Sequence, residues 1–189
     1  MDAPIATAAM PASRTVGAYL EEARCEVLRY LRNPGFLLPI ILFPNVFFVM
    51  FGIVLNRGDG EAARYMLASY STFGVMAPGL FGFGVSLALE RDSGLLTLKR
   101  ALPMPPGAYL LGKMLMAVLV ALVVGALLLA LALGGSQAPL APAQMATLLA
   151  VDAFGVLPFC ALGLLVGINM VFGGIALIAM ALHARKEAL

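Results

Sequence analysis

Apolar residues gather in long runs that short polar segments separate. The runs cover residues 36–55, 65–89, 110–133 and 144–167. Each is close to the roughly 20 apolar residues that a helix needs to cross a hydrocarbon core of about 30 Å. Short alternating segments typical of a transmembrane β-barrel do not occur, and a helix satisfies its own backbone hydrogen bonds. The pattern therefore predicts an all-α, polytopic membrane helical bundle with four spans.

Two further segments flank these runs. Residues 14–32 place Val16, Leu20 and Val27 near one face of a helix, with charged side chains elsewhere, which predicts an N-terminal amphipathic helix in the membrane interface. The last apolar piece, residues 171–182, would rise only about 18 Å as a helix, short of a roughly 30 Å core. This short C-terminal helix is either an interfacial or tilted extension of the fourth span, or the remnant of two spans whose connection is missing.

Small residues in two of the spans predict close helix packing. Ala117, Ala121 and Gly125 form a stripe on the third span, and Gly163 and Gly167 have the spacing GxxxG in the fourth. Small side chains let helix backbones approach each other in a membrane. We therefore expect helix contacts at these five positions.

Composition supports a membrane protein and excludes several classes of function. The chain has 189 residues, of which 62% are hydrophobic and 12% charged, and its mean hydropathy is +0.99. Soluble domains are about 45–50% apolar. A net charge of +2 argues against nucleic-acid binding. Neither a cluster of metal-binding residues nor a catalytic constellation occurs, so the sequence predicts no metal, no cofactor and no enzyme activity.

The distribution of lysine and arginine predicts the orientation. Basic residues concentrate before the first run, between the second and third runs, and in the tail. Such residues favour the cytoplasmic side of a membrane. We expect a plasma or inner membrane protein with both termini in the cytoplasm: a disordered segment over residues 1–13, one transmembrane domain over 14–182, and a tail over 183–189.

Two charged features could carry function. The segment from Glu90 to Lys113 is the only long charged stretch between two predicted spans, and it is either a contact surface for a cytoplasmic partner or a plain solvated loop. Asp152 is the sole acidic residue inside a predicted span, where a carboxylate is costly. It is either a polar residue that lines a transport pathway or a residue in the outer leaflet with access to water.

The charged segment resembles the membrane permeases of ABC type-2 exporters, the ABC-2 type transporter transmembrane domain. An acidic–basic pair and a glycine end the second span, a leucine and a proline follow, and Gly-Lys opens the third span. The residues that carry this resemblance are Glu90, Arg91, Gly94, Leu98, Pro103, Gly112 and Lys113. The order of the surrounding elements is also similar, over roughly residues 19–167.

The resemblance implies an ATP-driven exporter whose permease subunit pairs with a second copy or a paralogue in the lipid bilayer. In that family the loop between spans two and three docks on a separate cytoplasmic ABC ATPase subunit. By resemblance, Glu90, Arg91, Gly94 and Leu98 belong to the docking element. Gly107–Lys113 matches part of a phosphate-binding motif, but Met114 replaces its hydroxyl residue, so ATP hydrolysis is expected on the partner.

This chain also departs from the family pattern, which usually has six spans and an outer re-entrant segment. Here the fourth run leads into residues 171–182 with almost no gap. An alternative interpretation is therefore a small membrane assembly or regulatory protein, including an internally shortened permease.

Overall fold

The computed structural model describes residues 12–56, 59–95, 105–135 and 140–187, and every regular element among them is a helix. The elements are α1 (Ala12–Leu31), α2 (Pro34–Phe47), η1 (Phe48–Val54), α3 (Gly60–Ala77), η2 (Pro78–Val85), α4 (Ser86–Asp92), α6 (Pro106–Gly135) and α7 (Pro142–Glu187). Elements η1 and η2 are π-helical stretches that continue α2 and α3 without a break in the helix.

Among the described residues, four helical stretches are long and apolar enough to cross a membrane, as the hydropathy pattern predicts. They are Pro34–Val54, Gly60–Arg91, Gly107–Gly135 and Pro142–Val166. The first combines α2 with η1, and the second combines α3, η2 and α4. The prediction of a helical membrane bundle with four spans is therefore confirmed.

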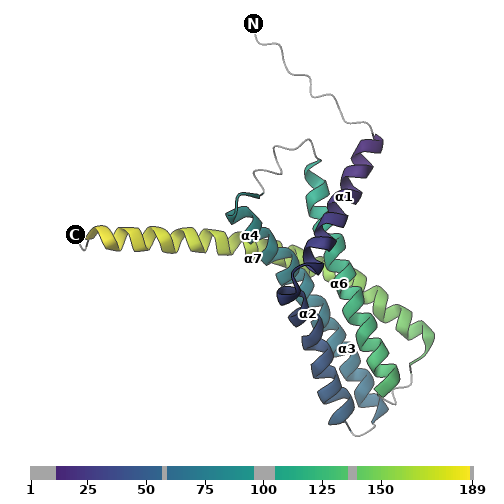
Figure 1. Ribbon diagram of the computed structural model, residues 1–189. Helices are drawn as coiled ribbons and strands as arrows, with labels where there is room; N and C mark the ends of the chain where they lie inside the picture. Colours follow the sequence, from purple (N-terminus) through teal and green to yellow (C-terminus); the bar gives the residue numbers. More distant parts are fainter. Residues whose placement is uncertain (1–11, 57–58, 96–104, 136–139, 188–189) are drawn as a thin grey trace.

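The spans form an elongated bundle with α1 at one end (Figure 1). The helices α2, α3 and α6 run side by side, and the end of η1 and the start of α3 lie at the far end from α1. Helix α1 packs on α6, and α7 packs on η2 and α6. The end of α4 and the start of α6 consequently lie at the same end of the bundle as α1.

The short C-terminal apolar piece is an extension of the fourth span. Residues 171–182 lie within α7, which is one continuous helix of 46 residues and therefore about 69 Å long. Figure 1 shows the last part of α7, in yellow, leaving the bundle sideways. The sequence left two alternatives open, and the structure shows the one in which residues 171–182 extend the helix of the fourth span. The same helix continues to Glu187, into the predicted tail, and most of the predicted N-terminal segment 1–13 lies outside the described residues.

Two clusters of buried side chains form the core. One joins α2, η1, α3 and α6 and consists of Ile40, Phe48, Leu67, Met116, Val120, Val124, Leu128 and Ala132. The other joins α3, η2, α6 and α7 and consists of Val75, Phe83, Ala117, Ala121, Val156 and Cys160. The small residues Ala117 and Ala121 thus lie where α6 meets α3 and α7.

Glycines bring η2 and α7 into backbone contact. A Cβ atom at Gly84 would overlap the carbonyl oxygen of Gly163, and one at Gly163 would lie 2.7 Å from the carbonyl oxygen of Gly79. Such close approach requires residues without side chains. This contact fixes the second span against α7 directly below the charged end of α4, while the surroundings of Gly167 lie outside the described side chains.

Candidate functional site

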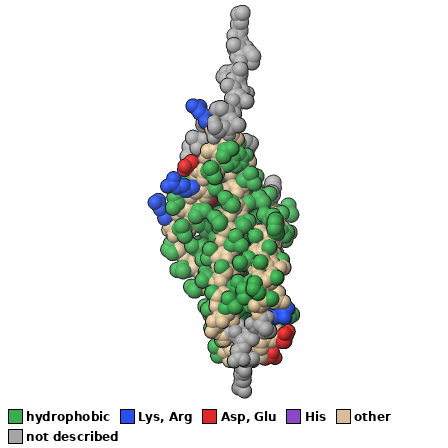
Figure 2. Space-filling view, turned by 90° about the vertical axis from the view of Figure 1, so that its right-hand side faces the viewer, with side chains coloured by type: hydrophobic (Ala, Val, Ile, Leu, Met, Phe, Trp, Pro, Cys, Tyr) green, Lys and Arg blue, Asp and Glu red, His purple; other side chains and the backbone are tan. Residues whose placement is uncertain are grey.

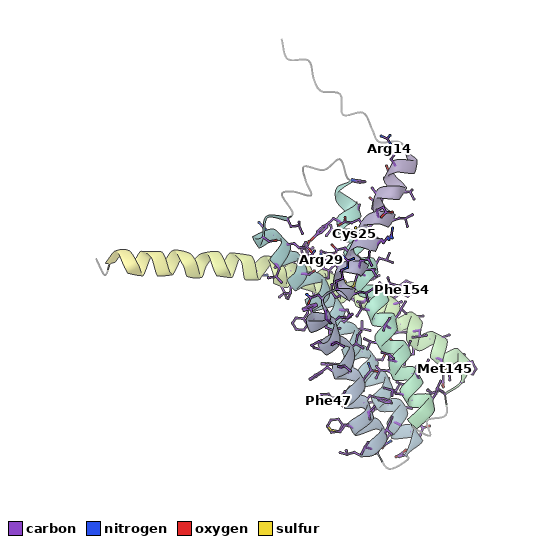
Figure 3. The ribbon with its side chains drawn as sticks, in the orientation of Figure 1. Arg14, Cys25, Arg29, Phe47, Met145 and Phe154 are labelled. Atoms are coloured by element: carbon purple, nitrogen blue, oxygen red, sulfur yellow. The ribbon has the colours of Figure 1, made fainter. Side chains whose placement is uncertain are left out.

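Charged side chains from three helices meet at the end of the bundle where α1 lies. Glu26 and Arg29 come from α1, Glu90 from α4, and Lys113 from α6, and these four residues are called the charge cluster below. Glu26, Glu90 and Lys113 are 3%, 1% and 4% exposed. Arg29 is the outward member, with a side chain that is 49% exposed (Figure 3).

Lys113 is the central group of the charge cluster. Its Nζ atom lies 2.8 Å from Glu90 Oε1 and 3.3 Å from Glu26 Oε2, and it donates to Ser86 Oγ at 3.0 Å. One ammonium group thus connects helices α1, α4 and α6. Because an ammonium group has three N–H donors, these three contacts can satisfy it completely.

Arg29 supplies the second positive charge. Its Nη1 atom donates to Glu90 Oε1 and lies 3.9 Å from Glu26 Oε1. Two carboxylates therefore face two cations, and the charge cluster has no net charge. Buried ions are tolerated when they are paired and hydrogen-bonded in this way, whereas loss of one partner leaves an uncompensated charge.

Tyr109 completes the surroundings of Glu90. Its hydroxyl group donates to Glu90 Oε2, and Lys113 Nζ lies 5.3 Å from the centroid of its ring. Both oxygens of Glu90 are thus hydrogen-bonded. Glu90 is consequently held from both sides, by the first turns of α6 and by α1.

Tyr30 borders the same region without joining the hydrogen bonds. Its hydroxyl group is buried and has no hydrogen-bond partner among the described residues, and it lies above Gly82, where a Cβ atom would be only 2.5 Å away. Burial raises the pKa of Tyr30 above its ordinary value of 10.0, and the charge of Glu26 adds to this effect. A cavity of about 110 Å³ lies here, lined by Tyr30, Ser86 and the charge cluster.

The chain leaves the bundle immediately after Glu90. Ser93 closes the last helical turn through its N–H group, which donates to the Leu89 carbonyl oxygen at 3.0 Å. Gly94 follows with φ of +73°, a left-handed conformation that glycine adopts without strain. Arg91 and Gly94 are exposed, whereas Glu90 points inward. Leu98, the fourth residue of the predicted docking element, lies outside the described residues.

Gly112 allows α1 to approach the start of α6. A Cβ atom at Gly112 would lie 3.4 Å from the backbone nitrogen of Ala23 and 3.5 Å from its Cα atom. Any larger side chain would therefore push α1 away from α6. The Gly-Lys pair that opens the third span thus has two distinct structural roles, close packing by Gly112 and charge pairing by Lys113.

Asp152 forms a separate polar contact deeper in the bundle. Ser71 of α3 donates from its Oγ atom to Asp152 of α7, at 2.6 Å from Oδ1 and 2.7 Å from Oδ2. Both residues are 3% exposed. Gly125 of α6 provides the room, because a Cβ atom there would overlap Asp152 Oδ2. The carboxylate therefore faces α3 and α6, and its place in a transport pathway stays a prediction.

Sequence reasoning selected Glu90 and Lys113 but missed their partners Glu26, Arg29 and Tyr109. The amphipathic pattern of residues 14–32 treats the charges of α1 as a solvated face, and only the position of α1 against α6 turns Glu26 inward. A usable signal was present, because Glu26 and Arg29 lie about two turns before the first span, near the expected level of Glu90 and Lys113.

The structure offers no metal site in the part of the chain that it describes. No group of three or more histidine, cysteine, aspartate or glutamate side chains is close enough there to hold a metal ion.

Comparisons with known proteins agree with this architecture. A family model described as "ABC-2 type transporter" matches residues 23–186. The chain is also similar to the "Putative transport permease YvfS" of Bacillus subtilis (strain 168), with 28% identity over 159 residues. That alignment covers 78% of this chain and 62% of the relative, so the chain spans less than two thirds of the relative's length. No solved structure matches the chain significantly.

Proposed function

Because the chain belongs to the ABC-2 type transporter family, we propose that it is the permease subunit of an ATP-driven exporter and that a separate cytoplasmic ABC ATPase drives it. Membership of the family supports a multi-pass transport permease. Coupling to a separate ATPase and the outward direction of transport are the parts that we add.

The observation that carries this proposal is the structure at the end of α4. Arg91 and Gly94 are exposed, and the residue before Arg91 is the deeply buried Glu90. We call residues 91–94 the docking turn. A surface that receives force from a partner must be fixed to the spans, and Glu90 fixes the docking turn to α1 and α6. In this proposal Arg91 and Gly94 face the ATPase, Glu90 holds them in place, and Leu98 extends the contact.

Charge distribution supports a cytoplasmic position for this end. Arg14, Arg24, Arg29 and Arg32 all belong to α1 or its end, and Lys113 opens α6 beside it. Figure 2 shows most of the visible basic side chains at the upper end, with a broad apolar band below them. Basic residues favour the cytoplasmic side, so the docking turn and both termini are assigned to the cytoplasm.

A second permease copy or paralogue is needed to form the substrate path. The two core clusters fill the space between the spans of one chain with apolar side chains. A path for substrate therefore runs between two subunits rather than through one. The outward faces of the spans are strongly apolar, with Phe43 of α2 52% and Phe154 of α7 73% exposed.

The direct test is purification of the tagged chain from its native membrane in a mild detergent, followed by mass spectrometry and an ATP hydrolysis assay. We expect an ABC ATPase to co-purify with the unmodified chain. The variant Arg91→Glu reverses the charge at residue 91, so it should lose the ATPase while the permease stays folded. A chain that is stable but arrives without any ATPase would favour the assembly or regulatory protein instead.

The matched control for this test lies at the opposite end of the bundle. Arg64→Glu changes an exposed arginine near the start of α3, where Arg64 lies 3.7 Å from Glu61. This variant has the same change of charge as Arg91→Glu. It should retain the ATPase, and equal loss from both variants would contradict a docking surface at residues 91–94.

A further inference from the structure

Lys113 connects two parts of the molecule that lie far apart in the sequence. It contacts Glu90, next to the docking turn, and Glu26 of the N-terminal helix α1, which lies outside the four spans. Sixty-four residues of chain, 26 to 90, separate the two carboxylates along the sequence. The contact is therefore a tertiary link between α1 and the end of the second span.

The link consists of two cations, each of which pairs with both carboxylates. Lys113 contacts both carboxylates, and Arg29 of α1 also contacts both, with Glu90 Oε1 shared by the two cations. A displacement of Glu90 by itself would separate it from both cations at once. Because Glu90 and Lys113 are buried, loss of their pairing leaves charges that water cannot easily solvate.

Helix α1 packs directly on α6. A Cβ atom at Gly112 would be in ordinary contact with the backbone of Ala23, 3.4 Å from its nitrogen, so little space separates the two helices there. Near the same place, a Cβ atom at Gly107 would lie 3.1 Å from the hydroxyl group of Tyr19. A displacement of Glu90 is therefore expected to displace both α1 and the first turns of α6.

We propose that Glu26 is a positioning residue whose pairing with Lys113 makes α1 move as one body with the docking turn. Displacement of the docking turn then shifts α1 as well as the second and third spans. The coupling part of this inference rests on the proposed function, since it requires an ATPase that moves the docking turn.

The test measures distances between two spin labels by electron–electron double resonance. Labels are attached to cysteines at Leu20 of α1 and Leu89 of α4, which are 65% and 64% exposed. Cys25 is exposed and is first replaced by serine, whereas Cys160 is buried and is retained. The full chain is measured with Glu26 in place and as Glu26→Gln, which removes the charge and keeps the shape.

The first measurement uses the chain alone in lipid nanodiscs, without any ATPase. We expect one narrow distance distribution with Glu26 in place and a broadened or second distribution in Glu26→Gln. The matched control is Glu21→Gln, because Glu21 pairs with Arg24 on the same helix at 3.8 Å while both side chains are about 70% exposed. It should leave the distribution narrow, and an unchanged distribution in Glu26→Gln would overturn the proposal.

The second measurement adds the co-purified ATPase and compares the nucleotide-free state with the state trapped by a non-hydrolysable ATP analogue. With Glu26 in place, the distance from Leu20 to Leu89 should stay constant between the two states. In Glu26→Gln it should shift on nucleotide binding, a response that a residue needed only for stability would not give. A nucleotide-dependent shift with Glu26 in place would overturn movement as one body.

A conservative variant separates this role from general loss of structure. Glu26→Asp keeps the negative charge opposite Lys113 and should retain the narrow distribution, at least in part. A distribution in Glu26→Asp as broad as that of a folded Glu26→Gln variant would count against the pairing. If no ATPase binds at all, the proposed function fails, while the measurement on the chain alone still decides the pairing of α1 with α4.

Discussion

The charge cluster and the Asp152 site both bury carboxylates in the bundle, but they stabilise them differently. Glu26 and Glu90 each face two cations, and Glu90 also accepts from Tyr109. Asp152 contacts the hydroxyl group of Ser71, and no salt bridge to it occurs among the described residues. The charge cluster lies at the end of the spans, whereas Asp152 lies about three turns into the fourth span.

This difference shows which helices each site holds together. The charge cluster joins α1, α4 and α6 through full charges, so its strength depends on every partner being present. The Asp152 site joins α3 and α7 through one hydroxyl group and relies on the missing side chain of Gly125 in α6. Removing a cation should therefore damage the first site more than removing the hydroxyl group damages the second.

The largest effect is expected for Lys113→Met. This change leaves Glu26 and Glu90 with only the half-exposed Arg29, and breaking a buried ion pair on one side costs about 3–5 kcal/mol. The variant should have a markedly lower thermal midpoint in detergent, measured by the monodisperse fraction after heating. Lys113→Met combined with Glu26→Gln should recover part of the loss, and a midpoint equal to that of the unmodified protein would contradict a structural role for Lys113.

The next effect concerns Gly125→Ala. The added methyl group overlaps Asp152 Oδ2, and overpacking in a well-packed interior costs about 1–3 kcal/mol. The same heating measurement should show a lower midpoint, and Asp152→Ala should relieve it because the smaller side chain makes room. Gly134→Ala is the matched control on the same helix, since nothing lies within 4 Å of the new Cβ atom. Equal loss in both variants would exclude the steric explanation.

A smaller effect is expected for Ser71→Ala. This change removes the hydroxyl group from Asp152, and hydrogen bonds between membrane helices contribute about 0.6 kcal/mol on average. Ser69→Ala provides a control, because Ser69 is exposed and bonds only within its own helix, to the Tyr65 carbonyl oxygen at 3.0 Å. The two variants should differ in thermal midpoint, and no difference would show that the Ser71 contact contributes nothing to stability.

The smallest effect at neutral pH is expected for Tyr30→Phe, because the lost hydroxyl group has no hydrogen-bond partner among the described residues. The effect of Tyr30→Phe on stability is expected at alkaline pH. The pKa of Tyr30 is raised in the folded protein, so the folded state keeps a proton that the unfolded state loses above pH 10.0. The stability gained is complete below pH 10.0 and falls as the pH rises further.

Measurement of the thermal midpoint against pH checks this sign. The unmodified protein should lose stability more steeply than Tyr30→Phe above pH 10.0, while the two should follow the same curve at lower pH. A steeper loss of stability in Tyr30→Phe would show that burial of this hydroxyl group does not govern the fall of the thermal midpoint at alkaline pH.

The four spans could be predicted from sequence because a membrane demands a long apolar run for each crossing. The continuous helix of residues 142–187 could not, since the apolar length of residues 171–182 says only that the piece is too short to cross alone. The sequence alone therefore left both alternatives open.

The candidate site was partly predictable in the same sense. Glu90 and Lys113 were selected by resemblance to a loop pattern, and Asp152 by its cost in a span. Their partners were not, because Ser71 and Asp152 are 81 residues apart in sequence, and Glu26 and Lys113 are 87 apart. Pairings over such distances depend on how helices pack, and a periodic pattern within one helix carries no information about its neighbour.

The glycine contact between η2 and α7 also sets up a lever. From Gly163 to Glu187 the helix extends about 36 Å, so a tilt of only about 10° at the contact would displace its far end by about 6 Å. Gly79, Gly84 and Gly163 meet there without side chains, so the two backbones touch directly. Adjustments of less than an ångström at this point would be amplified several-fold at the end of the chain.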